Sequence, residues 1–127
     1  MKREHFNPKK LAQPMATYAQ CVKKGNIVYT SGQVSIDASG SVIGKGDIEV
    51  QTRQVINNLI IALKSAGAGL EDVIKVTIFL KEIGDYKTMN KVFTEYFKDS
   101  PPARSTVLAD LVLDDFLIEI EAMAITG

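Results

Sequence analysis

The chain has very few of the side chains that bind metals or assist a covalent nucleophile. Its 127 residues include one cysteine, Cys21, one histidine, His5, and no tryptophan. A structural zinc site uses about four cysteine or histidine ligands, so we expect no metal. A serine or cysteine nucleophile would depend on His5, which lies in a segment that we expect to be a solvated tail. A lone cysteine forms no internal disulfide, which favours a reducing compartment.

The chain also lacks net charge and long apolar runs. Fifteen basic residues balance fifteen acidic ones, whereas nucleic-acid binders usually carry a basic excess. No stretch approaches the roughly 18 apolar residues of a membrane span, and the N-terminus has no apolar signal sequence. Residues 40–46 lack the spacing of a phosphate-binding loop. We therefore expect a cytoplasmic protein that needs no cofactor. We also expect it to bind neither nucleic acid nor a membrane.

What the sequence does contain is typical of one globular domain spanning residues 1–127. Apolar residues make up 46% of the chain and charged residues 24%, as in ordinary globular proteins. No internal repeat, low-complexity tract or linker divides the chain. A chain of this length forms one domain with a substantial core.

The order of periodic segments predicts an α+β fold. One helix is expected from its N-cap Asp47 to Ala66, and another from its N-cap Asp85 to about Lys98. Alternating and β-branched segments predict strands at residues 17–23, 27–31, 73–80, 104–108 and 117–125, with a short hairpin at 34–43. The two strand–helix–strand passages would pack both helices on one face of a mixed sheet of about six strands.

The other face of this sheet would have no cover within the chain. Residues 73–80 and 117–125 are apolar enough to be buried on both faces. We expect a second copy of the chain to provide the cover, which predicts a homo-oligomer with pockets between subunits.

Two charged residues near the C-terminus suggest a binding site. Arg104 follows Pro101-Pro102-Ala103 just before an apolar strand, and Glu119 interrupts the alternating residues 117–122. A guanidinium is a permanent cation whose planar donors fit both oxygens of a carboxylate. Together with a half-buried glutamate it could bind and hydrate a small anionic substrate.

The residues alone leave structural interpretations open. Arg104 could instead tie its turn to Asp114, Asp115 or a helix C-terminus. Glu119 and Glu121 could be solvated carboxylates on one face of the last strand.

Four short segments match a known pattern almost colinearly from Tyr18 to Ile125. They are Tyr29-Thr30-Ser31-Gly32-Gln33, Gln51-Thr52-Arg53-Gln54, Pro102-Ala103-Arg104-Ser105 and Ile118-Glu119-Ile120-Glu121-Ala122. These segments resemble the Rid/YjgF family of reactive intermediate deaminases. The resemblance implies a chorismate-mutase-like fold, a homotrimer with clefts between subunits and a cytoplasmic enzyme. It also implies hydrolysis of enamines and imines, such as 2-aminoacrylate and 2-iminopropionate, to 2-keto acids and ammonia.

The resemblance also implies roles for individual residues. Arg104 would clamp the substrate carboxylate, and Glu119 would position water and transfer protons. Tyr18, Ser31 and Asn90 match residues that line the cleft, with Tyr18 reaching it from a neighbouring subunit.

Three positions depart from the family pattern. Thr106 stands where cysteine is common, so that its backbone N–H would remain for binding but no thiol would. Residues 16–18 read Ala-Thr-Tyr in place of Gly-Pro-Tyr, and Asp110 replaces a small or basic residue. A carboxylate at position 110 would weaken the binding of an acidic substrate.

Other interpretations also follow from the sequence. Without a functional role, Tyr18 would be a strand residue, Asn90 would lie on a helix surface, and Ser31 would be a loop residue. Packing alone could explain Cys21, Thr106 and the aromatic stripe of residues 86–97. Functionally, the alternatives are a non-catalytic module that binds a small carboxylate, a deaminase of a larger substrate such as 2-aminomuconate, and RNA cleavage or translational inhibition. Neutral charge and the absence of an aromatic–basic platform argue against the last.

Overall fold

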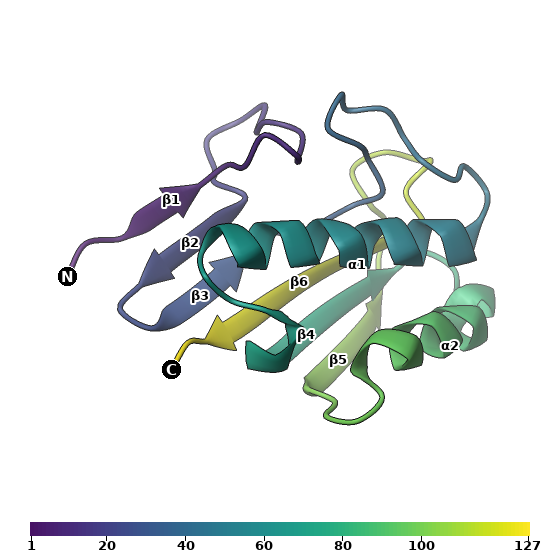
Figure 1. Ribbon diagram of the computed structural model, residues 1–127. Helices are drawn as coiled ribbons and strands as arrows, with labels where there is room; N and C mark the ends of the chain where they lie inside the picture. The colour runs from purple at the N-terminus through teal and green to yellow at the C-terminus, as the bar shows by residue number, and fades with distance from the viewer.

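The computed structural model describes residues 1–127 as one six-stranded sheet with two α-helices (Figure 1). The strand order is β1-β2-β3-β6-β4-β5, in which β4 and β5 are parallel and the other neighbours antiparallel. The elements are β1 (Glu4–Phe6), β2 (Cys21–Lys24), β3 (Ile27–Thr30), α1 (Ile48–Ser65), the 3-10 turn η1 (Leu70–Asp72), β4 (Val73–Leu80), the 3-10 turn η2 (Ile83–Asp85), α2 (Tyr86–Phe97), β5 (Ala103–Leu108) and β6 (Ile118–Ile125).

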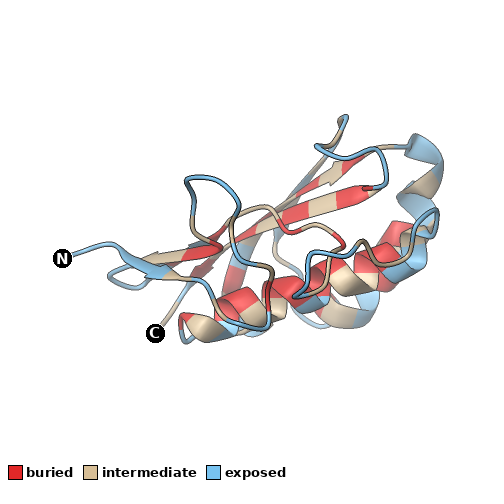
Figure 2. Ribbon diagram, turned by 90° about the horizontal axis from the view of Figure 1, so that it is seen from above, coloured by how far each residue is buried: buried red, intermediate tan, exposed pale blue.

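Both helices pack on one face of the sheet, which confirms the predicted α+β architecture. Buried and partly buried residues alternate along the central strands (Figure 2). In β6, Ile118, Ile120, Ala122 and Ala124 are buried toward the helices. The α1 boundaries also agree with the sequence, since Asp47 Oδ1 accepts a hydrogen bond of 3.1 Å from the Val50 N–H. Neither helix is long and apolar enough to cross a membrane.

The opposite face of the sheet is open in the single chain and is more polar than the sequence suggested. Strand β4 presents Lys75 and Thr77 there, and β6 presents Glu119 and Glu121, all partly buried. The expectation that both strands are apolar on both faces is therefore wrong. Cover by a second copy stays a prediction.

Two local predictions are also wrong. His5 belongs to β1, where it pairs with Val22 at the edge of the sheet, rather than to a loose tail. Three residues are too few for a recognisable alternation, so pairing with β2 determines this strand. Asp85 is the N-cap residue of α2, as predicted, although its side chain makes no capping hydrogen bond. The second wrong prediction is Tyr86, a member of the aromatic stripe expected to pack in the core, which is 40% exposed.

Residues 17–20 are irregular rather than a strand. The predicted short hairpin at 34–43 is present: Ile36 and Val42 form an antiparallel bridge, the Asp37 N–H donates to the Ser41 carbonyl at 3.0 Å, and the Ile43 N–H donates to the Ser35 carbonyl at 2.9 Å. Buried side-chain amides also bond to the backbone of these loops and of the segment before residue 17. Asn58 Nδ2 donates to the carbonyls of Val34 and Ile36, at 3.0 Å each. Gln20 Nε2 donates to the Ala12 carbonyl at 2.9 Å.

The Gln51 side chain likewise forms hydrogen bonds with the backbone of the loop between β5 and β6. It is fully buried, and its Nε2 donates to the Asp115 carbonyl at 2.8 Å and to the Gly44 carbonyl at 3.1 Å. Its Oε1 accepts from the Leu117 N–H at 2.9 Å. This one side chain therefore fastens two loops to the start of α1.

We expect Gln51→Leu to lower the free energy of unfolding by about 2–4 kcal/mol. The substitution keeps the volume but leaves three backbone groups without partners, and each unpaired buried group costs about 1–3 kcal/mol. Chemical denaturation measures the change. Asn57→Leu, on the exposed side of the same helix, is the matched control and should change stability by less than about 0.5 kcal/mol. An equally stable Gln51→Leu variant would contradict the anchoring role.

Candidate functional site

Arg104 lies on the helix-covered face of the edge strand β5. It is in register with the buried Val76 of β4. Its guanidinium carbon lies 5.2 Å from the ring centre of Phe93 and 5.9 Å from that of Tyr86. Its Nη2 donates to the Tyr86 hydroxyl at 3.2 Å. Arg104 forms no salt bridge with any carboxylate, so its positive charge is available to an anion.

Two further candidate residues gather around this guanidinium. Asn90 shares a helix face with Tyr86 and Phe93, because positions i, i+4 and i+7 project in the same direction. Thr106 follows Arg104 by two residues on the same face of β5. Asn90 Oδ1 and Thr106 Oγ1 are the two buried side-chain polar atoms without a hydrogen-bond partner. We call Arg104, Tyr86, Asn90 and Thr106 the arginine cluster.

The arginine cluster perturbs Tyr86. The Asn90 side chain and then the positive charge of Arg104 hold the pKa of the Tyr86 hydroxyl below its usual value. A phenol in contact with a cation is a better hydrogen-bond donor to a bound anion. Arg104 bonds neither to Asp114 or Asp115 nor to a helix C-terminus, so the structural roles considered for it are wrong.

Glu119 lies on the open face of β6, opposite Phe79 of β4. Its carboxyl group lines a cavity of about 350 Å³. The residues around this glutamate cavity are Ala12, Gln13, Met15, Tyr18, Gln20, Gly32, Val34, Ile36, Gly40, Val112, Leu113, Phe116 and Glu119. Tyr18 therefore shares a cavity with Glu119.

The surroundings of Glu119 favour its protonated form. Burial, and secondarily the charge of Glu121, raise the pKa of the Glu119 carboxyl above the ordinary value of a glutamate. No lysine, arginine or histidine lines the glutamate cavity to offset this effect. A carboxyl with a raised pKa is a stronger base than an ordinary glutamate, so it can both accept and return a proton during a reaction.

Gly32 sets the position of the Glu119 carboxyl. A Cβ atom at residue 32 would overlap Glu119 Oε2 and lie 2.7 Å from the carboxyl carbon. The Gln33 N–H donates to the Ile120 carbonyl at 2.8 Å, which holds residue 32 against β6. Sequence reasoning did not single out Gly32, although it lies inside the segment of residues 29–33.

Ser31 is engaged in local structure. Its hydroxyl donates to the Ala19 carbonyl and its N–H to the Gln20 carbonyl. These bonds connect the end of β3 to the segment that carries Tyr18. Ser31 is not among the residues that line the glutamate cavity.

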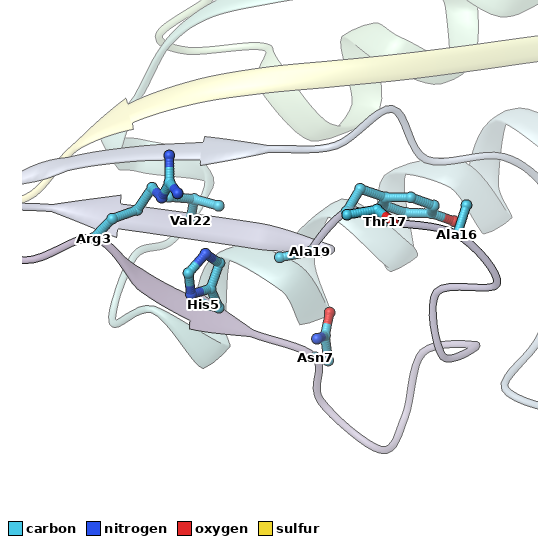
Figure 3. A pocket seen from close by; sticks show the side chains of 8 residues that line it. Arg3, His5, Asn7, Ala16, Thr17, Ala19 and Val22 are labelled. Atoms are coloured by element: carbon cyan, nitrogen blue, oxygen red, sulfur yellow. The ribbon is translucent and has the colours of Figure 1, made fainter.

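Tyr18 also borders a second, wider hollow of about 550 Å³ on the open face of the sheet. Figure 3 shows His5 on β1 and Arg3 just before that strand at one end of this hollow, and Ala16 and Thr17 at the other. His5 is the single histidine. No group of three or more histidine, cysteine, aspartate or glutamate side chains in the structure is placed to hold a metal ion.

Within one chain the arginine cluster and the glutamate cavity do not meet. Phe79 of β4 pairs with Glu119 of β6 on one side and with Val107 of β5 on the other. Strand β4 therefore separates Glu119 from β5, and Glu119 is level with Val107, three positions beyond Arg104. Strand spacing then puts the two Cα atoms about 14 Å apart. The side chains also point to opposite faces, because Val76 and Phe79 differ by an odd number of positions. A three-carbon acid cannot touch both side chains of the same chain.

The fold and these two clusters define a small α+β protein with an uncompensated arginine and a half-buried acid. A family model described as Endoribonuclease L-PSP matches residues 9–126. A crystal structure of a Thermotoga maritima protein has a TM-score of 0.93 at 36% identity and covers 100% of this chain and 99% of its own. A Yersinia pestis protein of the conserved Rid protein family has a TM-score of 0.92 at 33% identity, covering 98% and 100%. The chain belongs to the Rid/YjgF family.

Sequence relatives agree with this assignment. A RutC family protein of Pyrococcus abyssi is 44% identical over 124 residues, 98% of each chain. The 3-aminoacrylate deaminase RutC of Acinetobacter baylyi is 40% identical over 124 residues, again 98% of each. A 2-iminobutanoate/2-iminopropanoate deaminase of Dermatophagoides farinae is 34% identical over 113 residues, 89% of this chain and 88% of that protein.

Proposed function

We propose that the protein is a hydrolytic deaminase of small enamine and imine acids, and that it forms 2-keto acids and ammonia in the cytoplasm as a homotrimer. The observation that carries this proposal is the free charge of Arg104, which contacts two aromatic rings and a phenol but no carboxylate. The deaminase relatives from Acinetobacter baylyi and Dermatophagoides farinae support the reaction class.

Each site in this proposal uses two copies of the chain. The arginine cluster of one copy would face the glutamate cavity of the next, because a single copy holds them on opposite sides of the sheet. Association of this kind also covers the open sheet face. Tyr18 and Glu119 would then come from one subunit, and Arg104, Asn90 and Thr106 from its neighbour.

The reaction needs only these side chains and water. Arg104 would hold the substrate carboxylate and orient the electrophilic imine carbon, which contributes proximity and orientation. Glu119 would take a proton from water as the oxygen bonds to that carbon, and would return it to the nitrogen. In the collapse of the carbinolamine, Glu119 would take the hydroxyl proton and pass it to the nitrogen as the C–N bond breaks, so that the C=O bond of the keto acid forms and ammonia leaves. Positioned acid–base catalysis contributes about 10²–10⁴-fold.

The test is to generate 2-iminopropionate or 2-aminoacrylate in situ and to follow keto-acid appearance with and without the protein. We expect the protein to accelerate release in proportion to its concentration. A protein that binds pyruvate but leaves the rate unchanged would instead be a carboxylate-binding module. Larger substrates such as 2-aminomuconate are compared in the same assay.

RNA cleavage is less well supported by the residues. The net charge of the chain is zero, and its single histidine stands on an edge strand beside an open hollow of about 550 Å³. Phosphate backbones need clustered cations for tight binding. Salt-dependent RNA binding by the purified protein would favour this second activity.

The proposed base also predicts the pH dependence. Because the Glu119 pKa is raised, the active carboxylate should appear only above the usual pH range of a glutamate, so kcat/KM should rise with pH through that raised value. Glu121→Gln removes the charge that contributes to the shift and should move this acid limb to lower pH. A pH–rate profile measures it, with Glu71→Gln as a remote control. If the acid limb of kcat/KM stays at the same pH in Glu121→Gln, the role of Glu119 as base is contradicted.

A further inference from the structure

The glutamate cavity has an apolar wall that the deaminase reaction itself does not require. Leaving aside Met1, the two most exposed large apolar residues of the chain are Met15, at 98%, and Val112, at 89%. Both line the glutamate cavity, and Leu113, at 48% exposed, lies beside Val112. Exposed apolar groups that gather at a concave site mark a place where a ligand binds.

The wall is held in place at its base. Gln51 Nε2 bonds to the Asp115 carbonyl at 2.8 Å, and Lys81 Nζ bonds to the Asp114 carbonyl at 2.7 Å. The Phe116 N–H closes the loop onto the Leu113 carbonyl at 3.1 Å. The loop of residues 110–116 therefore presents Val112 and Leu113 on a fixed frame, although their side chains are exposed.

The charges around the cavity define which part of a substrate can enter it. Glu119 is the one acid that lines the cavity, and no base lines it. In the proposed assembly, the cation that could offset the repulsion between Glu119 and a bound carboxylate is Arg104 of the neighbouring copy, because the cavity's own lining has none. The carboxylate of the substrate must therefore bind at the arginine cluster, and the group that enters the cavity is uncharged.

We propose that Met15, Val112 and Leu113 form a subsite for the side chain of the substrate and select imines with branched or long aliphatic side chains over the methyl imine. This inference rests on the proposed deaminase function. A cavity of about 350 Å³ leaves a methyl group largely uncontacted, whereas an isobutyl group reaches the wall. A single methylene in an apolar pocket changes kcat/KM by about 10–200-fold. The same wall disfavours a substrate with a second carboxylate.

The test compares kcat/KM for the imines formed in situ from leucine and from alanine. Wild type should prefer the leucine-derived imine by at least about tenfold. The double variant Val112→Thr/Leu113→Asn keeps the side-chain volumes but makes the wall polar. It should bring the preference toward one by lowering kcat/KM for the leucine-derived imine. Ile83→Asn is the matched control, since Ile83 is 67% exposed but lines no cavity, and it should keep the wild-type preference.

Three results would overturn the inference. The first is a wild type that turns over the methyl imine as well as the branched one. The second is a double variant that keeps the full preference. The third is a double variant that loses both activities together with its native molar mass in light scattering, which would make the wall a contact between copies. If wild type accelerates neither imine, the deaminase proposal fails. Calorimetry with pyruvate and 4-methyl-2-oxopentanoate then still tests the wall, through a tenfold difference in Kd.

Discussion

Arg104→Ala is expected to lower kcat/KM by about 10²–10⁴-fold and to remove keto-acid binding. Hydrogen bonds to a charged group contribute about 1.5–3 kcal/mol each, and a guanidinium offers two of them to a carboxylate. Glu119→Gln should lower turnover by a similar factor while a keto acid still binds, because the carboxylate clamp is intact. Imine hydrolysis assays and calorimetry with pyruvate separate the two effects.

The matched control for this pair is Arg53→Ala. Arg53 forms ion pairs with Glu49 at 3.2 Å and Glu95 at 2.8 Å on the outer surface of the helices. Exposed pairs of this kind contribute about 0–1 kcal/mol, so kcat/KM should remain at the wild-type value. Full activity of Arg104→Ala would remove the arginine cluster from the site. Loss of keto-acid binding in Glu119→Gln would show that Glu119 contributes to ligand binding rather than to proton transfer.

Gly32→Ala is expected to lower kcat by about 10²-fold with little change in stability. The added methyl group would occupy the space of Glu119 Oε2, so the carboxyl must move by an ångström or more. Displacements of that size cost on the order of 10²-fold in rate when the displaced group is the base. Steady-state kinetics and thermal unfolding of the same sample measure the two quantities.

Gly84→Ala provides the comparison for the glycine position. A Cβ at residue 84 meets no atom within 4 Å, and Gly84 does not have a positive φ. The same chemical change should therefore leave kcat unchanged. A Gly32→Ala variant with wild-type kcat would mean that the Glu119 carboxyl either moves freely or does not act in the reaction.

Periodic segments of the sequence predicted the main elements of the fold correctly. Helix α1 combines an N-cap aspartate with a long apolar stripe, and β4 is rich in β-branched residues, so local preference and tertiary packing agree. Where the two do not agree, prediction failed. Strand β1 is too short to show alternation, and residues 17–20 are irregular, where the Gln20 side chain bonds to the Ala12 carbonyl.

The candidate site shows a different limit of sequence reasoning. Alternation identifies which residues of one strand share a face, but not which of its faces meets the helices. The parallel register of β5 on β4 decides this for Arg104, and that register depends on the whole crossover. The sequence therefore predicted both charged residues but not that one chain keeps them apart. Gln51 and Gly32 carry no local signal of their role, since it arises from contacts with distant segments.

The most direct test of the account is complementation between two inactive variants. Arg104→Ala and Glu119→Ala are each expected to be inactive, and are unfolded and refolded together in equal amounts. If each site takes its arginine from one copy and its glutamate from the next, about one quarter of the seams in random mixed assemblies hold both intact residues. The account predicts that about a quarter of wild-type activity returns. Mixed assemblies that form, as mass spectrometry would show, but remain inactive would contradict a site shared between two copies.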